Sequence, residues 1–316
     1  MLRTTRIFAV GALVAVAACV AEKAPAVPIS DAKAVVFNEA AWKPHREADI
    51  PNDSMGASIR RGLYLLRFTP ESLPAYAPGR VRCTSCHQDD GLRPTAAPLT
   101  GSHARFPKYM PRSGAVIALA DRVNYCFTRS LAGYAIPVGS REMTDLLAYM
   151  AFISDDIPVG TKIAGADGLI SMPDTLEGDV ARGEALFTAK TCSTCHGATG
   201  EGVGPVPPLW GGNSYSVGAS MARLERAASF IKHNMPQTAP GTLTAQEAFD
   251  LSAYINSHAR PDSPGKEFDW PMGGAPKDVP YDTKGHSAFR PPPVLPRASR
   301  RGALVPTPPV ISRGGR

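Results

Sequence analysis

The 316-residue sequence lacks the features that a membrane-spanning or nucleic-acid-binding protein needs. The uncharged apolar run near its start covers residues 7–18, which is shorter than the roughly 20 residues of a transmembrane helix. The sequence has no helix-turn-helix pattern, aromatic platform or zinc-finger spacing, and aromatic residues make up only 7% of it. We therefore expect no nucleic-acid partner.

Acidic residues are absent from the end of the chain, and this local bias accounts for the net charge of +6. Seven basic residues follow Asp282, so the preceding part of the chain is nearly neutral. The basic end is rich in proline and is expected to be extended. It either wraps the domains, or binds an acidic redox partner, or is a solvated tail with little fixed structure beyond about residue 295.

Positive charge is present at the start, where Arg3 and Arg6 precede the apolar run. This pattern is typical of a signal peptide, which we expect at residues 1–18. The sequence VAAC that ends at Cys19 fits a bacterial lipobox, in which Cys19 would carry a lipid anchor. The alternative is ordinary cleavage nearby, which yields a soluble protein. Both interpretations predict a periplasmic location, with membrane anchorage if Cys19 is lipidated.

Cysteine is scarce, with six residues in the chain, and four of them lie in two Cys-x-x-Cys-His motifs. In this motif the two thiols attach a haem covalently and the histidine binds its iron. A Cys-x-x-Cys pair can also hold zinc or act as a redox dithiol, but two complete motifs in an exported chain favour haem. We therefore predict two covalently bound haem c groups. The attachment residues are Cys83, Cys86, His87, Cys192, Cys195 and His196.

The sequences around the two motifs repeat in the same order. Arg61-Gly62 and Arg182-Gly183 precede the motifs, Pro98-Leu99 and Pro208-Leu209 follow them, and similar Asp-Leu-x-Ala-Tyr segments begin at Asp145 and Asp250. The offsets are 121, 110 and 105 residues, so the loops between the shared elements differ in length. We therefore predict a mainly α fold of two class I cytochrome c-like domains in tandem, with an extended Pro-rich C-terminal tail.

These elements also suggest where each part of the chain begins and ends. We expect a signal peptide at 1–18, a linker or N-terminal extension at 19–55, a first cytochrome domain at 56–160, a linker at 161–178, a second cytochrome domain at 179–260 and the tail at 261–316. In the second domain Gly183 permits a close crossing of the first and last helices, and Thr244 and Glu247 form a capping box. A carbonyl from the Pro208-Leu209 loop is expected to orient the haem histidine.

Each haem iron needs a second axial ligand unless its sixth position is open. Met235 lies 39 residues beyond His196, and Cys126 lies 39 residues beyond His87. The matched spacing predicts that these four residues are the iron ligands. A methionine raises the reduction potential of a haem, which suits an electron-exit haem, whereas a thiolate is expected to lower it.

Other roles for the two sulfur residues stay open. Met235 can fill a gap in the core, with Met221 or His233 as the ligand instead. Cys126 can be a buried free cysteine between two aromatic residues.

Basic residues are concentrated around Cys126. Between His103 and Arg129 they are Arg105, Lys108, Arg112, Arg122 and Arg129, against the single acidic residue Asp121. Arg122 and Ser130 lie four residues to either side of Cys126, so a helix would bring both toward it. Guanidinium groups bind oxyanions, including haem propionates, but five basic residues exceed what two propionates need. We expect at least some of them to meet an external anion.

At this point the sequence resembles a known family. The run FPKYMPRSG from Phe106 and the run RVNYCFTRS from Arg122 resemble the bacterial dihaem thiosulfate dehydrogenases, as do SREM at 140–143, AYM at 148–150 and NMP at 234–236. The likeness covers roughly residues 50–260. It implies oxidation of two thiosulfates to tetrathionate, with electrons passed to an acceptor cytochrome or another periplasmic redox protein.

The resemblance also implies roles for single residues. His87 and Cys126 would bind the catalytic haem of the first domain, and Arg112, Arg122 and Ser130 would line the thiosulfate pocket. Clustered arginines would offset the repulsion between two dianions. We add the hypothesis that Cys126 leaves the iron and forms a covalent sulfur adduct with the first thiosulfate, which the second then attacks. The haem of the second domain would transfer the electrons outward.

One family feature is missing, and three other functions remain open. Some members carry a lysine just before the distal methionine and exchange ligands on reduction; here that residue is Asn234, so no such exchange is expected. The chain can instead be a non-catalytic dihaem electron carrier. It can be a Sox-type sulfur-oxidation subunit that acts on a carrier protein. It can also work mainly in reverse, as a tetrathionate reductase.

Overall fold

The computed structural model describes residues 37–163, 168–173 and 175–284. The expected signal peptide, Cys19 and the part of the tail beyond residue 284 lie outside the described residues. Among the residues that are described, every helix is too short or too polar to cross a bilayer.

The first half of the chain is built mainly from short helices. In order they are η1 (Glu47–Asp49), α1 (Ser54–Arg67), α2 (Thr69–Ser72), α3 (Cys83–Cys86), η2 (Asp89–Gly91), α4 (Ser102–Arg105), α5 (Leu119–Tyr125), the π-helix η3 (Cys126–Ser130) and α6 (Arg141–Phe152). Strands β1 (Lys108–Met110) and β2 (Ala115–Ile117) precede α5 and pair antiparallel, with Tyr109 opposite Val116. This hairpin is the only sheet among the described residues.

The second half repeats the helical pattern without a hairpin. Its elements are α7 (Val180–Ala189), α8 (Ser193–His196), η4 (Ser220–Ala222), α9 (Leu224–Asn234), α10 (Ala245–Ser257) and η5 (Lys266–Phe268). The expected capping box at the start of α10 is confirmed, because the Thr244 side chain accepts from the Glu247 N–H and the Glu247 side chain accepts from the Thr244 N–H. The mainly α fold predicted from the sequence is also confirmed.

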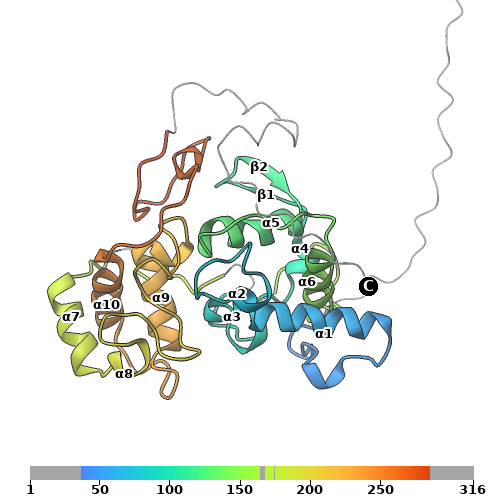
Figure 1. The fold of residues 1–316 in the computed structure, drawn as a ribbon, viewed down its shortest axis with the longest axis horizontal. Helices are drawn as coiled ribbons and strands as arrows, with labels where there is room; N and C mark the ends of the chain where they lie inside the picture. Colours follow the sequence, from blue (N-terminus) through green and yellow to red (C-terminus); the bar gives the residue numbers. More distant parts are fainter. Residues whose placement is uncertain (1–36, 164–167, 174, 285–316) are drawn as a thin grey trace, which may run out of the picture. The chain divides into compact units, whose positions relative to one another are not determined.

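The first and last helices of each half cross closely, and a glycine lies at each crossing. Figure 1 shows α1 against α6 and, in the second half, α7 beside α10. A Cβ atom on Gly62 would lie 2.0 Å from the Asp145 carbonyl oxygen, and one on Gly183 would lie 2.0 Å from the Asp250 carbonyl oxygen. Any larger residue would push the helices apart, so the repeated glycine is explained by packing in both halves.

The arginine before each glycine closes the same crossing from its edge. Arg61 donates from Nε and Nη2 to the two carboxylate oxygens of Asp145, at 2.8 and 2.9 Å. Arg182 makes the same paired contact with Asp250, at 2.9 and 2.8 Å. The repeated Arg-Gly and Asp-Leu segments of the sequence are therefore partners in space, which their order along the chain did not reveal.

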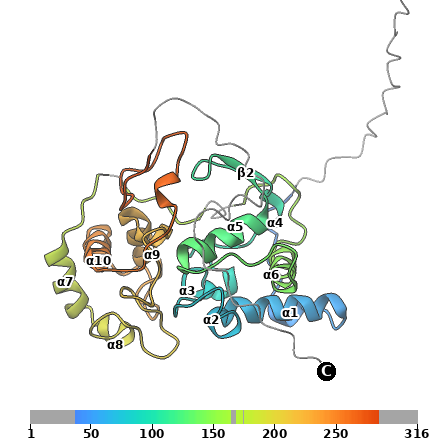
Figure 2. The same cartoon turned by 45° about the horizontal axis from the view of Figure 1, so that its top comes forward.

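The apolar core is divided into three clusters, and one of them joins the two halves. Phe127 and Met143 of the first half pack in the same buried cluster as Tyr215, Ala219 and Ala222 of the second half. A second cluster lies between α1 and α6, and a third is made by α7, α9 and α10. Residues 258–284, the described segment that follows α10, lie beside the β1–β2 hairpin in both Figures 1 and 2.

Candidate functional site

The first Cys-x-x-Cys-His motif forms the short helix α3, which is tied to the preceding helix α2. The Thr69 hydroxyl accepts from the Cys83 N–H at 3.1 Å and donates to the Cys83 sulfur at 3.3 Å. Burial raises the pKa of both Cys83 and Cys86 to about 12. Both thiols are therefore protonated at neutral pH, and neither is the reactive thiolate of this centre.

A backbone carbonyl orients the histidine of each motif. His87 Nδ1 lies 2.5 Å from the Ala97 carbonyl oxygen, and His196 Nδ1 lies 3.2 Å from the Pro207 carbonyl oxygen. Each carbonyl belongs to the residue just before the repeated Pro-Leu step, as expected from the sequence. Because Nδ1 donates to a carbonyl, Nε2 is the nitrogen that can bind iron. Burial lowers the pKa of His196, which favours the neutral ring that a metal ligand needs.

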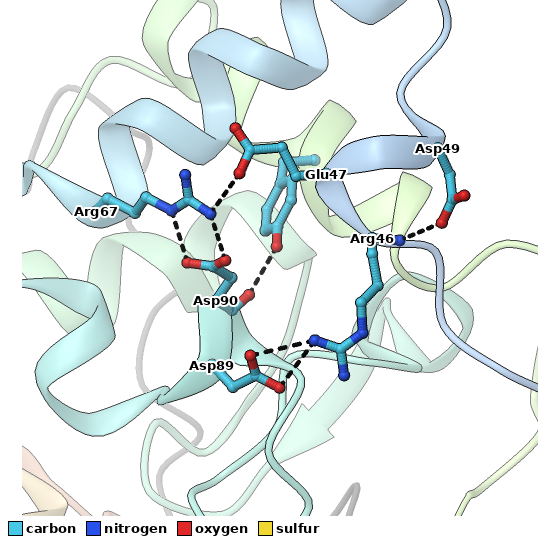
Figure 3. Close-up of polar contacts among 7 residues, drawn as sticks. Arg46, Glu47, Asp49, Arg67, Asp89 and Asp90 are labelled. Atoms are coloured by element: carbon cyan, nitrogen blue, oxygen red, sulfur yellow. Dashed lines mark hydrogen bonds and ion pairs between the residues drawn. The ribbon is translucent and has the colours of Figure 1, made fainter.

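Ion pairs anchor the loop that follows His87 (Figure 3). Arg67, the last residue of α1, donates to both carboxylate oxygens of Asp90 at 2.8 and 2.6 Å and to Glu47 at 2.8 Å. Tyr149 of α6 donates to the Asp90 carbonyl oxygen at 2.8 Å. Arg46 holds Asp89 through a single nitrogen, because its Nη1 donates to both carboxylate oxygens at 3.2 and 3.1 Å. These contacts fix the loop between the helices, and the position of His87 is fixed with it.

Cys126 lies where α5 changes into a π-helix. The N–H of Leu131 donates to the Cys126 carbonyl at 2.9 Å, a five-residue step that widens the turn. Single wide turns of this kind occur often at functional sites. Arg122 lies one α-helical turn earlier, and its Nη1 is 3.1 Å from the Cys126 sulfur. Ser130 ends the π-helix and is half-buried.

The surroundings of Cys126 favour a thiolate. Burial alone would raise its pKa, but the charge of Arg122 and a hydrogen bond with His87 outweigh burial and lower the pKa to about 6. The contact with His87 brings together two residues that are 39 positions apart. The charge of Cys126 also raises the pKa of Cys83 and Cys86. The motif and Cys126 therefore form a single centre.

This donor set fits a c-type haem with histidine and thiolate ligands. Two neighbouring protonated thiols can form the thioether links, while one imidazole nitrogen and one thiolate face each other. None of the five described cysteines forms a disulfide, so all of these thiols are available for such bonds.

The second motif is surrounded by Met235 and aromatic side chains, whereas a charged arginine lies beside Cys126 in the first centre. Cys192 is the N-cap residue directly before α8, and Met235, the residue after α9, packs against the same apolar cluster as Cys192 and Trp210. Met221, the rival ligand, packs instead against the cluster that joins the two halves. The other rival, His233, bonds through Nδ1 to the Ser229 carbonyl at 2.8 Å. Met235 is thus the candidate that shares a cluster with the second motif.

A buried amide links the loops of the two centres. Asn234 is fully buried, and its Nδ2 donates to the carbonyls of Thr95 and Phe230, each at 3.0 Å. The Thr95 hydroxyl donates to Asn234 Oδ1 at 2.8 Å. Asn234 precedes Met235, and Thr95 lies two residues before Ala97, the residue whose carbonyl orients His87. The two candidate haem loops are therefore in direct hydrogen-bonded contact.

Three of the five basic residues predicted around Cys126 divide into two groups. Arg122 contacts the Cys126 sulfur, whereas Arg112 and Arg129 both bind the carboxylate of Asp269. The Arg112 guanidinium bonds to Asp269, Tyr281 and the Gly218 carbonyl rather than to Cys126. Asp269 was missed at the sequence level, because an isolated aspartate 157 residues from Arg112 carries no local signal.

Comparisons with known proteins agree on the family. The family described as the cytochrome c domain of SoxA/TsdA matches residues 75–159, and the cytochrome c family matches residues 180–259. Two cytochrome c domains therefore follow each other along the chain, as predicted. The chain is 41% identical over 239 residues to a thiosulfate dehydrogenase of Psychrobacter arcticus, covering 74% of this chain and 72% of that protein.

Other relatives lead to the same family. A thiosulfate dehydrogenase of Allochromatium vinosum is 39% identical over 222 residues, covering 67% of this chain and 82% of that protein. Among solved structures, the thiosulfate dehydrogenase TsdBA of Marichromatium purpuratum matches with a TM-score of 0.65 and 32% identity. That match covers 72% of this chain and 51% of the solved chain, so this chain spans about half of that protein's length.

Proposed function

Because the chain belongs to the thiosulfate dehydrogenase family, we propose that it oxidises two thiosulfate ions to tetrathionate at its first cytochrome domain. The observation that carries this proposal is the arrangement around Cys126. Its sulfur is 3.1 Å from Arg122 Nη1, faces His87, and has a pKa lowered to about 6. A thiolate beside a guanidinium combines a nucleophile with a binding group for an anion.

In the first step the Cys126 thiolate bonds to the outer sulfur of one thiosulfate. No proton needs to leave, because the lowered pKa keeps the thiol ionised at neutral pH. Each of the two sulfur atoms brings a lone pair, and the new S–S bond holds only one electron pair, so the step releases two electrons. The two haems, when bound, accept these electrons and pass them to an external acceptor. Arg122 stabilises the negative charge that collects around Cys126 as the dianion arrives.

In the second step another thiosulfate attacks the outer sulfur of the adduct. The bond to Cys126 breaks, its electron pair returns to Cys126 as a thiolate, and tetrathionate leaves. No further electrons are released. Ser130 and Arg112 complete the proposed pocket, with Arg112 held in place by Asp269 rather than by contact with Cys126.

The second domain serves as the outlet for electrons in this proposal. His196 and Met235 would bind its haem, and methionine ligation raises the potential, which draws electrons from the first domain. The hydrogen bonds between Asn234 and Thr95 keep the two haem loops in contact. The acceptor would be a cytochrome or another redox protein of the periplasm, to which residues 1–18 would direct the chain. A lipid on Cys19 would anchor the chain to a membrane.

The proposal is tested by replacing Cys126 with glycine. Purified holoprotein is supplied with thiosulfate alone, and ferricyanide reduction and tetrathionate are measured. Cys126→Gly should abolish turnover while both haems remain covalently attached. Arg122→Gln should lower kcat/KM by roughly a hundredfold, whereas the exposed Arg141→Gln serves as the matched control and should be unchanged.

The outcomes separate the alternatives. Full activity in Cys126→Gly would refute the proposed role of the thiolate. Wild-type protein that takes no electrons from thiosulfate and gives none to tetrathionate would be a carrier or a Sox-type subunit. If the protein reduces tetrathionate faster than it forms it from thiosulfate, it works mainly as a tetrathionate reductase.

A further inference from the structure

The segment that follows α10 covers the loop between β1 and β2. The Trp270 N–H donates to the Arg112 carbonyl at 2.8 Å, and the Arg112 guanidinium lies 4.9 Å from the centre of the Trp270 ring. A Cβ atom on Gly114 would lie 2.5 Å from a side-chain carbon of Pro271, so the Pro271 ring packs closely against the Gly114 backbone. The beginning of the predicted tail is therefore packed onto the first domain.

This contact buries one carboxylate among two guanidinium groups. Asp269 is 2% exposed, and its oxygens bind Arg112 Nε at 2.8 Å and Arg129 Nη2. Tyr281 donates to the carboxylate at 2.7 Å and accepts from Arg112 Nη2 at 2.5 Å. Burial raises the pKa of Tyr281 to about 12, which keeps its hydroxyl able to donate. The cluster is fully paired and still has a net positive charge.

Both arginines of this cluster belong to the surroundings of Cys126. Arg129 lies in the π-helix that begins at Cys126, and its guanidinium lies 4.2 Å from the centre of the Tyr125 ring. Its backbone carbonyl accepts from the Ser216 hydroxyl. Arg112 is one of the residues expected to bind thiosulfate. Asp269 therefore holds an arginine of the π-helix that begins at Cys126 together with an arginine of the proposed thiosulfate pocket.

Two guanidinium groups share one carboxylate, so Asp269 cannot neutralise both arginines, and this ratio indicates that it positions them. Two guanidinium groups held close together repel each other, and long side chains without a partner sample many conformations. One buried carboxylate holds both in a single geometry and leaves one positive charge for an incoming anion. Oriented binding groups of this kind lower the cost of bringing a substrate into place.

We propose that Asp269 is a positioning residue of the thiosulfate site: it fixes Arg112 and Arg129 so that they can bind the anion. This inference rests on the proposed function. The competing role is a purely structural one, in which Asp269 only fastens the segment to the first domain. A structural role would change the amount of active protein, whereas a positioning role changes the concentration of thiosulfate needed.

The test compares Asp269→Asn with Asp282→Asn in the full-length holoprotein. Both variants remove one negative charge from the same segment, but Asp282 is exposed. Asp269→Asn should raise the half-saturating thiosulfate concentration by about tenfold or more, with kcat per intact dihaem protein largely unchanged. Asp282→Asn should match the wild type. A lower kcat with unchanged half-saturation in Asp269→Asn would overturn the proposal.

A second variant covers the case in which Asp269→Asn does not fold. Tyr281→Phe removes one hydrogen bond to Asp269 and one to Arg112, but leaves the buried ion pairs in place. A rise of a few-fold in half-saturating thiosulfate supports the proposal, and no rise overturns it. The wild type is assayed before the variants. If it does not oxidise thiosulfate, the proposed function itself is refuted, and this failure is distinct from that of the positioning role.

Discussion

The two halves of the chain share a scaffold but differ in what they place beside the haem motif. In both, a glycine lets the first and last helices touch, an Arg–Asp pair closes the crossing, and a loop carbonyl orients the motif histidine. The first half adds a thiolate and guanidinium groups. The second half adds a thioether. A duplicated scaffold has thus kept its packing while its distal residues have diverged.

The two halves also differ in their aromatic side chains. Phe187, Trp210, Tyr254 and His258 form one aromatic cluster, with Trp210 and His258 stacked at 4.0 Å. The repeat offsets match Phe187 to Leu66 and His258 to Ile153, which are aliphatic core residues of the first half. An apolar, ring-lined centre suits electron transfer, whereas a charged centre suits the binding of an anion.

The largest effect is expected from exchanging the distal residues. Cys126→Met gives the first half the residue type proposed as the ligand of the second, and thiosulfate oxidation should fall at least about a thousandfold because a thioether cannot form the sulfur adduct. The potential of the first haem should rise. Met235→Cys is the matched exchange and should lower the second haem's potential while thiosulfate is still oxidised. Steady-state assays and potentiometric titration measure both. If Cys126→Met kept a tenth of the activity, the division of roles between the halves would be wrong.

A smaller effect is expected from filling the two helix crossings. Gly62→Ala and Gly183→Ala should each lower the free energy of unfolding by about 1–3 kcal/mol, because the added methyl group would lie 2.0 Å from a carbonyl oxygen. Gly139→Ala is the control, since nothing lies within 4 Å of its Cβ position. Thermal unfolding followed by haem absorbance measures the change. Tolerance of alanine at only one crossing would show that the scaffolds are not equivalent.

The smallest effect is expected from the Arg–Asp pairs, because both arginine side chains are more than one third exposed to water. Burial raises the pKa of Asp145, but hydrogen bonds from Arg61 outweigh it and the net shift is downward. Hydrogen bonds from Arg182 lower the pKa of Asp250. Because its pKa is lower in the folded protein, each carboxylate stabilises the fold at pH values above its unfolded pKa of about 3.9. This stabilisation is lost as the pH falls through the folded pKa.

Asp145→Asn and Asp250→Asn should therefore each lower the melting temperature at pH 7 by similar small amounts. The difference from the wild type should shrink as the pH falls below about 4, because the wild-type carboxylates are then protonated. Melting curves at several pH values measure this. A difference that stays constant down to the acid limit would mean that the pairs act through packing rather than charge.

Much of the site could be read from the sequence because its signals are short. The two motifs, the matched spacing of Cys126 and Met235 and the capping box at Thr244 depend on neighbours within a helix or on a repeat. The closeness of Arg122 and Cys126 follows from one helical turn. The recurrence of Arg61 and Asp145 in the second half could also be read from the sequence, but their pairing across the helix crossing was seen only in the structure.

The two haem motifs, the duplication and the candidate distal residues were determined by the sequence alone, because covalent attachment and helical spacing are local properties of the chain. Only the tertiary structure decided that Asp269 holds Arg112 and Arg129, and that Asn234 joins the second haem loop to Thr95 of the first. These contacts link positions more than a hundred residues apart. These contacts depend on which surfaces pack together in the folded protein, and no spacing in the sequence indicates them.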